Sequence, residues 1–140
     1  MANALYSKAR QRFLEGQLNW LTDTIKVVLV DTGAYTFSEA HEFLSSVPAP
    51  SRITGSTLLT GKTTTDGAAN ADNSPFLAVT GTTIEALVIY KEVLDGSSNP
   101  DDTLSVLIAY IDTATGLPIT PNGGTLLITW DNGPNKIFRL

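Results

Sequence analysis

Residues 24–30 read TIKVVLV, an apolar run interrupted only by one lysine. The run is too short for a stable helix, and its β-branched side chains favour extended backbone. Because polar and apolar residues do not alternate, both faces of this segment should be covered by the rest of the protein. We therefore expect a central strand here, ended by the turn residues Asp31-Thr32-Gly33.

Beyond Arg52 the sequence shows similar short segments separated by turns. Strands are predicted at residues 53–60, 62–65, 76–80, 84–93, 104–112, 125–130 and 136–138. Asp66-Gly67 and Asp95-Gly96 are typical of the turns between them, because these residues tolerate the backbone of tight turns. Short strands at spacings of roughly 8 to 12 residues, without helices between them, predict a mainly β fold. An antiparallel β-sandwich or a jelly-roll-like barrel fits best.

The last residues resemble a terminal hairpin. The segments Thr129-Trp130 and Lys136-Ile137-Phe138 flank the turn-forming residues 131–135. Two other segments, 66–75 and 95–102, are rich in small polar residues and are predicted to be exposed loops.

Residues 2–16 are the best candidate for a helix. Leu5, Ala9 and Phe13 recur at four-residue intervals, and Gly16 is a suitable stop. A helix of about fifteen residues is marginal alone, so its apolar stripe must pack against its own domain or against another subunit.

The single domain therefore divides into an N-terminal amphipathic arm, residues 1–22, and a β-rich body, residues 23–140. Five side chains of the arm are candidates for an interface with a partner: Leu5, Tyr6, Phe13, Leu14 and Trp20. Deletion of residues 1–21 should then abolish partner binding and leave a folded core.

One short additional helix is predicted after the first strand. Thr36 and Glu39 have the spacing of a capping box, and the helix would run to about Ser46. Pro48 and Pro50 then favour extended chain.

Composition limits the classes of function. The 140 residues suit one domain, and there is no cysteine to form a disulfide, a thiolate nucleophile or a zinc-thiolate site. No apolar stretch is long enough for a membrane span. The net charge of −5 disfavours nucleic acid as a partner. Lys8, Arg10 and Arg12 are a basic exception, either a solvated helix face or an arm that docks on an acidic partner.

Two motifs resemble ligand-binding loops but are incomplete. Gly61-Lys62-Thr63 matches the end of a phosphate-binding loop, but Ser56 stands where the first glycine belongs and no helix is predicted to follow. Residues 95–101 alternate oxygen-bearing side chains as a calcium loop does, but Pro100 and Val106 occupy the glycine and glutamate positions of an EF-hand. Adventitious calcium would use Asp95, Asn99 and Asp101.

Few residues suggest catalysis. His41 is the only histidine, and no serine stands in a glycine-flanked nucleophile elbow. A carboxylate pair for glycoside hydrolysis stays open among Glu85, Glu92, Asp112 and Asp131. Four rings either stack on a sugar or pack in a core: Trp20, Tyr90, Tyr110 and Trp130. We expect no enzyme, no catalytic residue, no cofactor and no metal.

Five stretches of the chain resemble a family of small virion proteins of tailed bacteriophages. They are residues 1–10, 13–16, 24–35, 109–124 and 128–133. The resemblance implies a capsid cement or decoration protein, made in the bacterial cytoplasm and located in the virion. Its partners would be the major capsid protein or other virion proteins, and it would form a dimer or trimer. The alternatives are a head–tail connector, a tail component or a glycan-binding β-sandwich.

Overall fold

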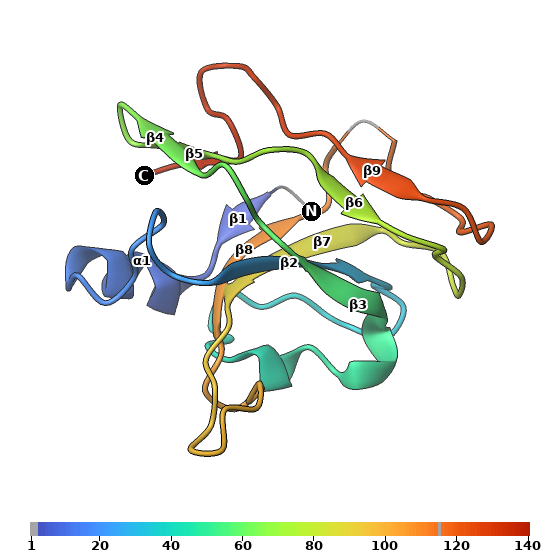
Figure 1. The fold of residues 1–140 in the computed structure, drawn as a ribbon, viewed down its shortest axis with the longest axis horizontal. Coiled ribbons are helices and arrows are strands. Elements are labelled where there is room, and N and C mark those ends of the chain that lie inside the picture. Colours follow the sequence, from blue (N-terminus) through green and yellow to red (C-terminus); the bar gives the residue numbers. More distant parts are fainter. Residues whose placement is uncertain (1–2, 115) are drawn as a thin grey trace.

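Ten strands in three antiparallel sheets dominate the computed structural model, which describes residues 3–114 and 116–140 (Figure 1). The main sheet has the order β1-β8-β7-β2-β3. Its strands are β1 (Ala4–Leu5), β2 (Ile25–Val30), β3 (Arg52–Leu58), β7 (Ala86–Lys91) and β8 (Val106–Ile111). One small sheet contains β10 (Phe138–Arg139), β5 (Ala68–Asn70) and β4 (Thr63–Thr65), and the other contains β6 (Ser74–Phe76) and β9 (Leu126–Ile128).

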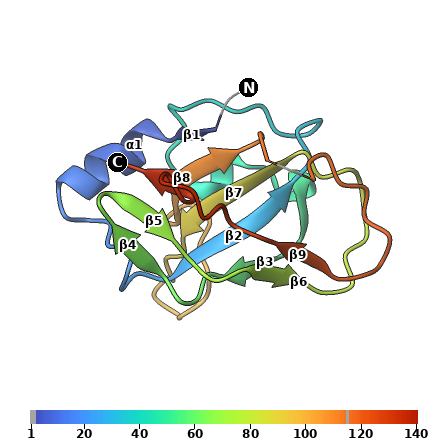
Figure 2. The same cartoon turned by 90° about the horizontal axis from the view of Figure 1, so that it is seen from above.

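The central strand predicted from TIKVVLV is confirmed as β2. It pairs with β7 along its whole length and with β3 on its other edge. The segment 31–51 covers one face of the main sheet, and the two small sheets lie over the other (Figures 1 and 2). Because both faces are covered, β2, β7 and β8 are buried almost throughout and need no polar alternation.

The prediction of an antiparallel, mainly β fold is correct, and the strands of the described residues close no barrel. The predicted strand at 76–80 is largely wrong: β6 ends at Phe76, and Ala78 has a φ of 50°, which extended chain does not adopt. The predicted loop at 66–75 contains β5, which the Asp66-Gly67 turn folds back onto β4.

The predicted terminal hairpin is wrong. β9 pairs with β6, whereas β10 pairs with β5 in the other small sheet. Residues 129–137 cross from one small sheet to the other, because Trp130 is anchored beside β6 through a hydrogen bond of its indole N–H to the Ser74 hydroxyl, 3.3 Å.

The N-terminal helix is shorter than predicted, since α1 spans Ser7–Leu14. Leu5 and Tyr6 are extended because they belong to the edge of the main sheet. Leu5 pairs with Ala109 in β1–β8, and the Tyr6 N–H donates to the Ile108 carbonyl at 3.0 Å. The arm is therefore built into the body, and the division at residue 22 does not separate two packing units.

The predicted helix at residues 36–46 is wrong. Only a short 3-10 turn, Leu44–Ser46, forms there, and a second one follows at Ala49–Ser51. The backbone of this segment bonds to residues at the start of β8 instead. The Leu44 N–H donates to the Ser105 carbonyl, and the Glu42 carbonyl accepts from the Leu107 N–H. These bonds cover the edge of β8 next to β1, so pairing with the sheet replaces the bonds of a helix.

All four tyrosines of the chain are buried, and burial raises the pKa of each phenol. For Tyr110 burial, followed by the nearby Asp112 carboxylate, raises the pKa to about 12. A pKa that is higher in the folded chain than the value of about 10 in the unfolded chain stabilises the fold below pH ~10.

We therefore expect the free energy of unfolding to fall as the pH rises from 10 towards 12. Denaturant titrations at several pH values, followed by circular dichroism, measure this loss, and tyrosinate absorbance should rise together with unfolding. Tyrosines that ionise near pH 10 in a protein with unchanged circular dichroism would contradict the prediction.

Candidate functional site

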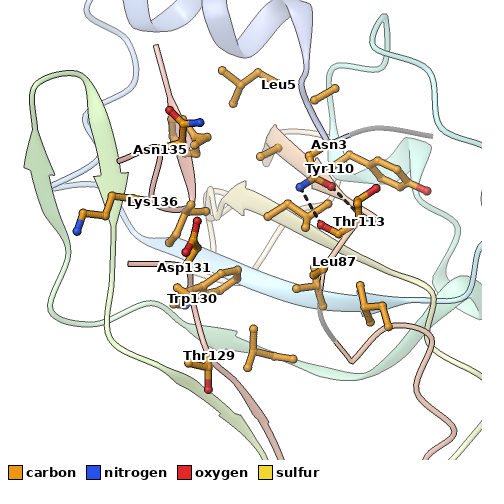
Figure 3. Close-up of a pocket in the computed structure, with 18 of the residues that line it drawn as sticks. Asn3, Leu5, Leu87, Tyr110, Thr113, Thr129, Trp130, Asp131, Asn135 and Lys136 are labelled. Carbon is orange, nitrogen blue, oxygen red and sulfur yellow. Dashed lines mark hydrogen bonds between the residues drawn. The ribbon is translucent and has the colours of Figure 1, made fainter. Parts of the chain in front are cut away.

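A cavity lies between the main sheet and the C-terminal segment, and we call it the terminal groove (Figure 3). It has a volume of about 1520 Å³. β1, β7 and β8 line one wall, and residues 127–139 line the other. The groove thus brings together two parts of the chain that lie more than a hundred positions apart.

The floor of the terminal groove is apolar. Leu5, Leu87 and Trp130 enter it from three different elements (Figure 3), and each is at most 9% exposed. The floor is therefore almost closed to water. Only the mouth of the groove is open to a partner, so the mouth decides what can bind.

The mouth carries more positive than negative side chains. Arg10 of α1 and Arg139 of β10 lie there with Lys136, whose side chain turns away from the cavity in Figure 3. Asp131 is the one carboxylate among the lining residues, and it accepts a hydrogen bond from the Gly133 N–H at 3.0 Å. A cationic mouth stands out on a chain with a net charge of −5.

Two side chains fix the walls of the groove. Asn3 holds the end of β8, since its side-chain oxygen accepts from the N–H groups of Asp112 and Thr113 at 3.0 and 2.9 Å. Its amide also donates to the Thr113 carbonyl at 3.1 Å (Figure 3). Trp130 fixes the opposite wall through Ser74.

The five residues expected at an interface have different environments. Leu5, Tyr6 and Trp20 are buried in the core of the same chain, and Phe13 is half-buried against Phe138. These four side chains pack against their own domain. The sequence left open whether they pack there or against another subunit. Leu14 is 90% exposed and is the one member of the set available to another molecule.

The Gly-Lys-Thr motif does not build a phosphate site. It begins at Gly61, whose added Cβ would lie only 2.3 Å from the Asp72 carboxylate. The Lys62 ammonium donates to the Asp23 carbonyl, and Thr63 opens β4 rather than a helix. A carboxylate next to the loop disfavours an anion there.

The resemblance to a calcium loop is also explained locally. One oxygen of Asp95 accepts from the N–H groups of Ser97 and Asn99, and one oxygen of Asp101 accepts from the N–H and hydroxyl of Thr103. These bonds shape the β7–β8 loop, which was predicted to be exposed. Within residues 3–114 and 116–140, no three metal-ligating side chains gather.

The four candidate carboxylates are dispersed. Glu92 pairs with Lys26 at 2.6 Å, and Asp131 lies at the terminal groove. Glu85 and Asp112 do share a small pocket of about 260 Å³ with Tyr110. The raised pKa of Tyr110 keeps that phenol neutral at ordinary pH, so it offers a hydroxyl group rather than a base.

The aromatic side chains leave no stacking platform for a sugar. Trp20, Trp130, Tyr90 and Tyr110 are each at most 7% exposed. The His41 imidazole is also occupied, because its Nδ1 lies 2.9 Å from the Tyr35 hydroxyl, which in turn lies 3.0 Å from the Tyr6 hydroxyl. These rings stabilise the core.

The chain matches no protein-family model, and no curated protein is significantly similar to it. Among the described residues, no helix has the length and apolarity needed to cross a bilayer. The terminal groove could not be found from the sequence, because its two walls come from segments that lie far apart in the chain and meet only in the folded structure. The cationic arm residues were the one signal that pointed to its mouth.

Proposed function

We propose that the protein is a structural component of a tailed-bacteriophage virion, a cement or decoration protein that binds the capsid lattice and stabilises the head. The proposal rests on the resemblance of both ends of the chain to small phage virion proteins and on the surface described next. It assigns the chain to the virion, with the major capsid protein as partner, and gives it no catalytic role.

The observation that carries the proposal is an apolar face on the outermost sheet, which we call the β6–β9 patch. Pro75 lies directly opposite Leu127 in the β6–β9 pairing, and Leu77 follows two residues after Pro75. Leu77 is 72% exposed and Leu127 is 57% exposed. Adjacent exposed apolar side chains on a small domain are typical of a surface that binds another protein.

The architecture supports the same role. We propose a β-sandwich in which the two small sheets form a second layer over the main sheet (Figure 2). In that arrangement the β6–β9 patch faces outward on a layer that the main sheet supports from behind. A patch held in this way does not need to become ordered on binding, which lowers the entropic cost of each contact. Weak contacts of this kind stabilise a shell when symmetry repeats them many times.

The test is saturable loading of the purified protein onto expanded capsids that lack it. We expect Leu77→Glu to weaken loading at least about tenfold, because a carboxylate in an apolar contact is desolvated without a partner. Leu21→Glu is the matched control, since it places the same charge at a leucine that is 51% exposed in the connector after α1, and Leu14→Glu tests the helix in parallel. Bound copies per capsid are counted in the same experiment.

The outcomes separate the possible roles. Loss of loading in Leu14→Glu rather than in Leu77→Glu would move the docking surface to the helix and keep the capsid role. Saturation at about a dozen copies or fewer would indicate a ring at the connector or tail. A wild-type protein that does not bind capsids at any concentration would overturn the proposal.

A further inference from the structure

Two surfaces on this chain are complementary to each other. The first is the mouth of the terminal groove, with the guanidinium groups of Arg10 and Arg139 and the nearby Leu14. Arg10 and Leu14 are four residues apart on α1, so they are neighbours on one helix face. The Arg10 side chain is 49% exposed, and its pairing with Glu39 at 3.8 Å is too long and too exposed to neutralise it.

The second surface is the β7–β8 loop, residues 92–105. It contains four acidic residues and no basic one. Glu92 and Asp102 are paired with Lys26 and Arg52. Asp95 and Asp101 bond only to uncharged groups of the loop itself, so their negative charges are left for a partner.

The β7–β8 loop also matches the mouth in its apolar side chains. Leu94 is 48% exposed and Leu104 is 45% exposed, one on each side of the loop. Leu94 is held in an isolated bridge to Pro100, so its position is fixed by the loop's own backbone pairing. The loop therefore presents a preformed combination of exposed leucine and carboxylate, whereas the mouth presents leucine and guanidinium.

We propose that the mouth of the terminal groove binds the β7–β8 loop of a second copy of this chain. In Figure 1 the loop extends below the main sheet, away from α1 and β10, so a chain cannot fill its own mouth. The contact joins two different surfaces and is therefore head-to-tail, a type that closes into a ring when its rotation permits. It deepens the proposed function, because it supplies the contact between neighbouring copies on a shell.

The choice of a second copy follows from charge. Two copies that each carry a net charge of −5 repel at long range, so association needs a local match of opposite charge. Two such pairs are available, between the guanidinium groups of Arg10 and Arg139 in one copy and the carboxylates of Asp95 and Asp101 in the other.

The test is the mass of the purified protein by sedimentation or light scattering across concentration and salt. The wild type should exceed the monomer mass of 14.9 kDa and return to it as salt is raised. Asp95→Asn combined with Asp101→Asn removes both charges but keeps the side-chain oxygens that shape the loop. This variant should raise the dissociation constant at least about tenfold. Asp31→Asn with Asp72→Asn is the matched control, since it makes the same change in net charge at residues outside the mouth and the β7–β8 loop.

Charge reversal gives the decisive comparison. Asp95→Lys with Asp101→Lys, and separately Arg10→Glu with Arg139→Glu, should each be monomeric, because like charges then face each other. Mixing the two variants should restore the wild-type mass, since every reversed loop meets a reversed mouth. Circular dichroism checks that each variant is folded. If a reversed variant is unfolded, the test is the mass of the Asp95→Asn, Asp101→Asn variant compared with the mass of its control variant.

The contact is overturned if the wild type is monomeric at low salt, or if it associates and neither neutralisation nor reversal changes its mass. Capsid loading is measured separately for the Asp95→Asn, Asp101→Asn variant. If the wild type associates but never loads capsids, the result would support the contact between copies and contradict the capsid role. A wild-type protein that is monomeric at low salt yet loads capsids normally would contradict the contact between copies and support the capsid role.

Discussion

Tyr6→Ala should lower the free energy of unfolding by about 3–5 kcal/mol, the cost typical of deleting a large buried aromatic side chain. Tyr6 is fully buried, packs edge-on against Phe37 at 5.3 Å and shares a hydrogen bond with Tyr35. It also joins β1 to α1, so the cavity would open at the edge of the main sheet. Because small domains have only about 5–15 kcal/mol of stability, this loss should be visible as a large fall in the denaturant midpoint.

Two other variants calibrate this result. Tyr6→Phe keeps the ring and removes the hydroxyl group, so we expect a smaller loss of about 1 kcal/mol. Leu14→Ala changes a side chain of α1 that is 90% exposed, and its stability should stay within about 0.5 kcal/mol of the wild type. Equal effects of Tyr6→Ala and Leu14→Ala would mean that the arm does not pack as described.

Trp20→Ala should also cost about 3–5 kcal/mol. The indole N–H donates to the Asn70 carbonyl at 3.0 Å, and the ring meets Phe138 edge-on at 5.2 Å. Trp20 thus ties the connector after α1 to both β5 and β10. Loss of this ring should loosen the small sheet, which limited proteolysis of the native protein would detect as faster cleavage near the C-terminal strand.

The control for Trp20→Ala is its neighbour Leu21, which is 51% exposed and should tolerate alanine with little change. The pair of variants also separates two roles for the indole. A Trp20→Ala protein that keeps wild-type stability but loses partner binding would show that the indole belongs to an interface, as the sequence suggested, and not to the core.

The structure changes the expected result of deleting residues 1–21. The sequence suggested that a folded core would remain. The deletion removes β1 from the main sheet and removes Tyr6, Ala9, Leu18 and Trp20 from the core. Such a protein is expected to be unfolded, so the deletion cannot test partner binding.

Strands with a strong local signal could be predicted from the sequence. β2, β7 and β8 are nearly continuous apolar runs, because both faces of the sheet are covered. Side chains on both faces of each strand are therefore apolar, and this pattern can be recognised in the sequence. β1 has only two residues, and it exists because β8, about a hundred positions away in the chain, pairs with it. Local patterns carry no information about such pairings.

The errors at residues 3–6 and 36–46 have the same origin. Both segments have a helical pattern, and both use their backbone groups to cover the outer edge of β8 instead. Tertiary pairing therefore overrides local propensity along this one edge. The terminal groove was missed because its C-terminal wall is placed by the pairings of β9 with β6 and of β10 with β5, which local patterns do not reveal.

The pairing of β1 with β8 has a consequence for synthesis on the ribosome. Asn3 and Thr113 are bonded across a sequence separation of 110 residues. Residues 3–5 must therefore wait, unpaired, until β8 has been translated. Long-range contacts of this kind slow folding. While they wait, the apolar side chains of Leu5 and Tyr6 are open to chaperones and to neighbouring nascent chains, and aggregation competes with folding during this interval.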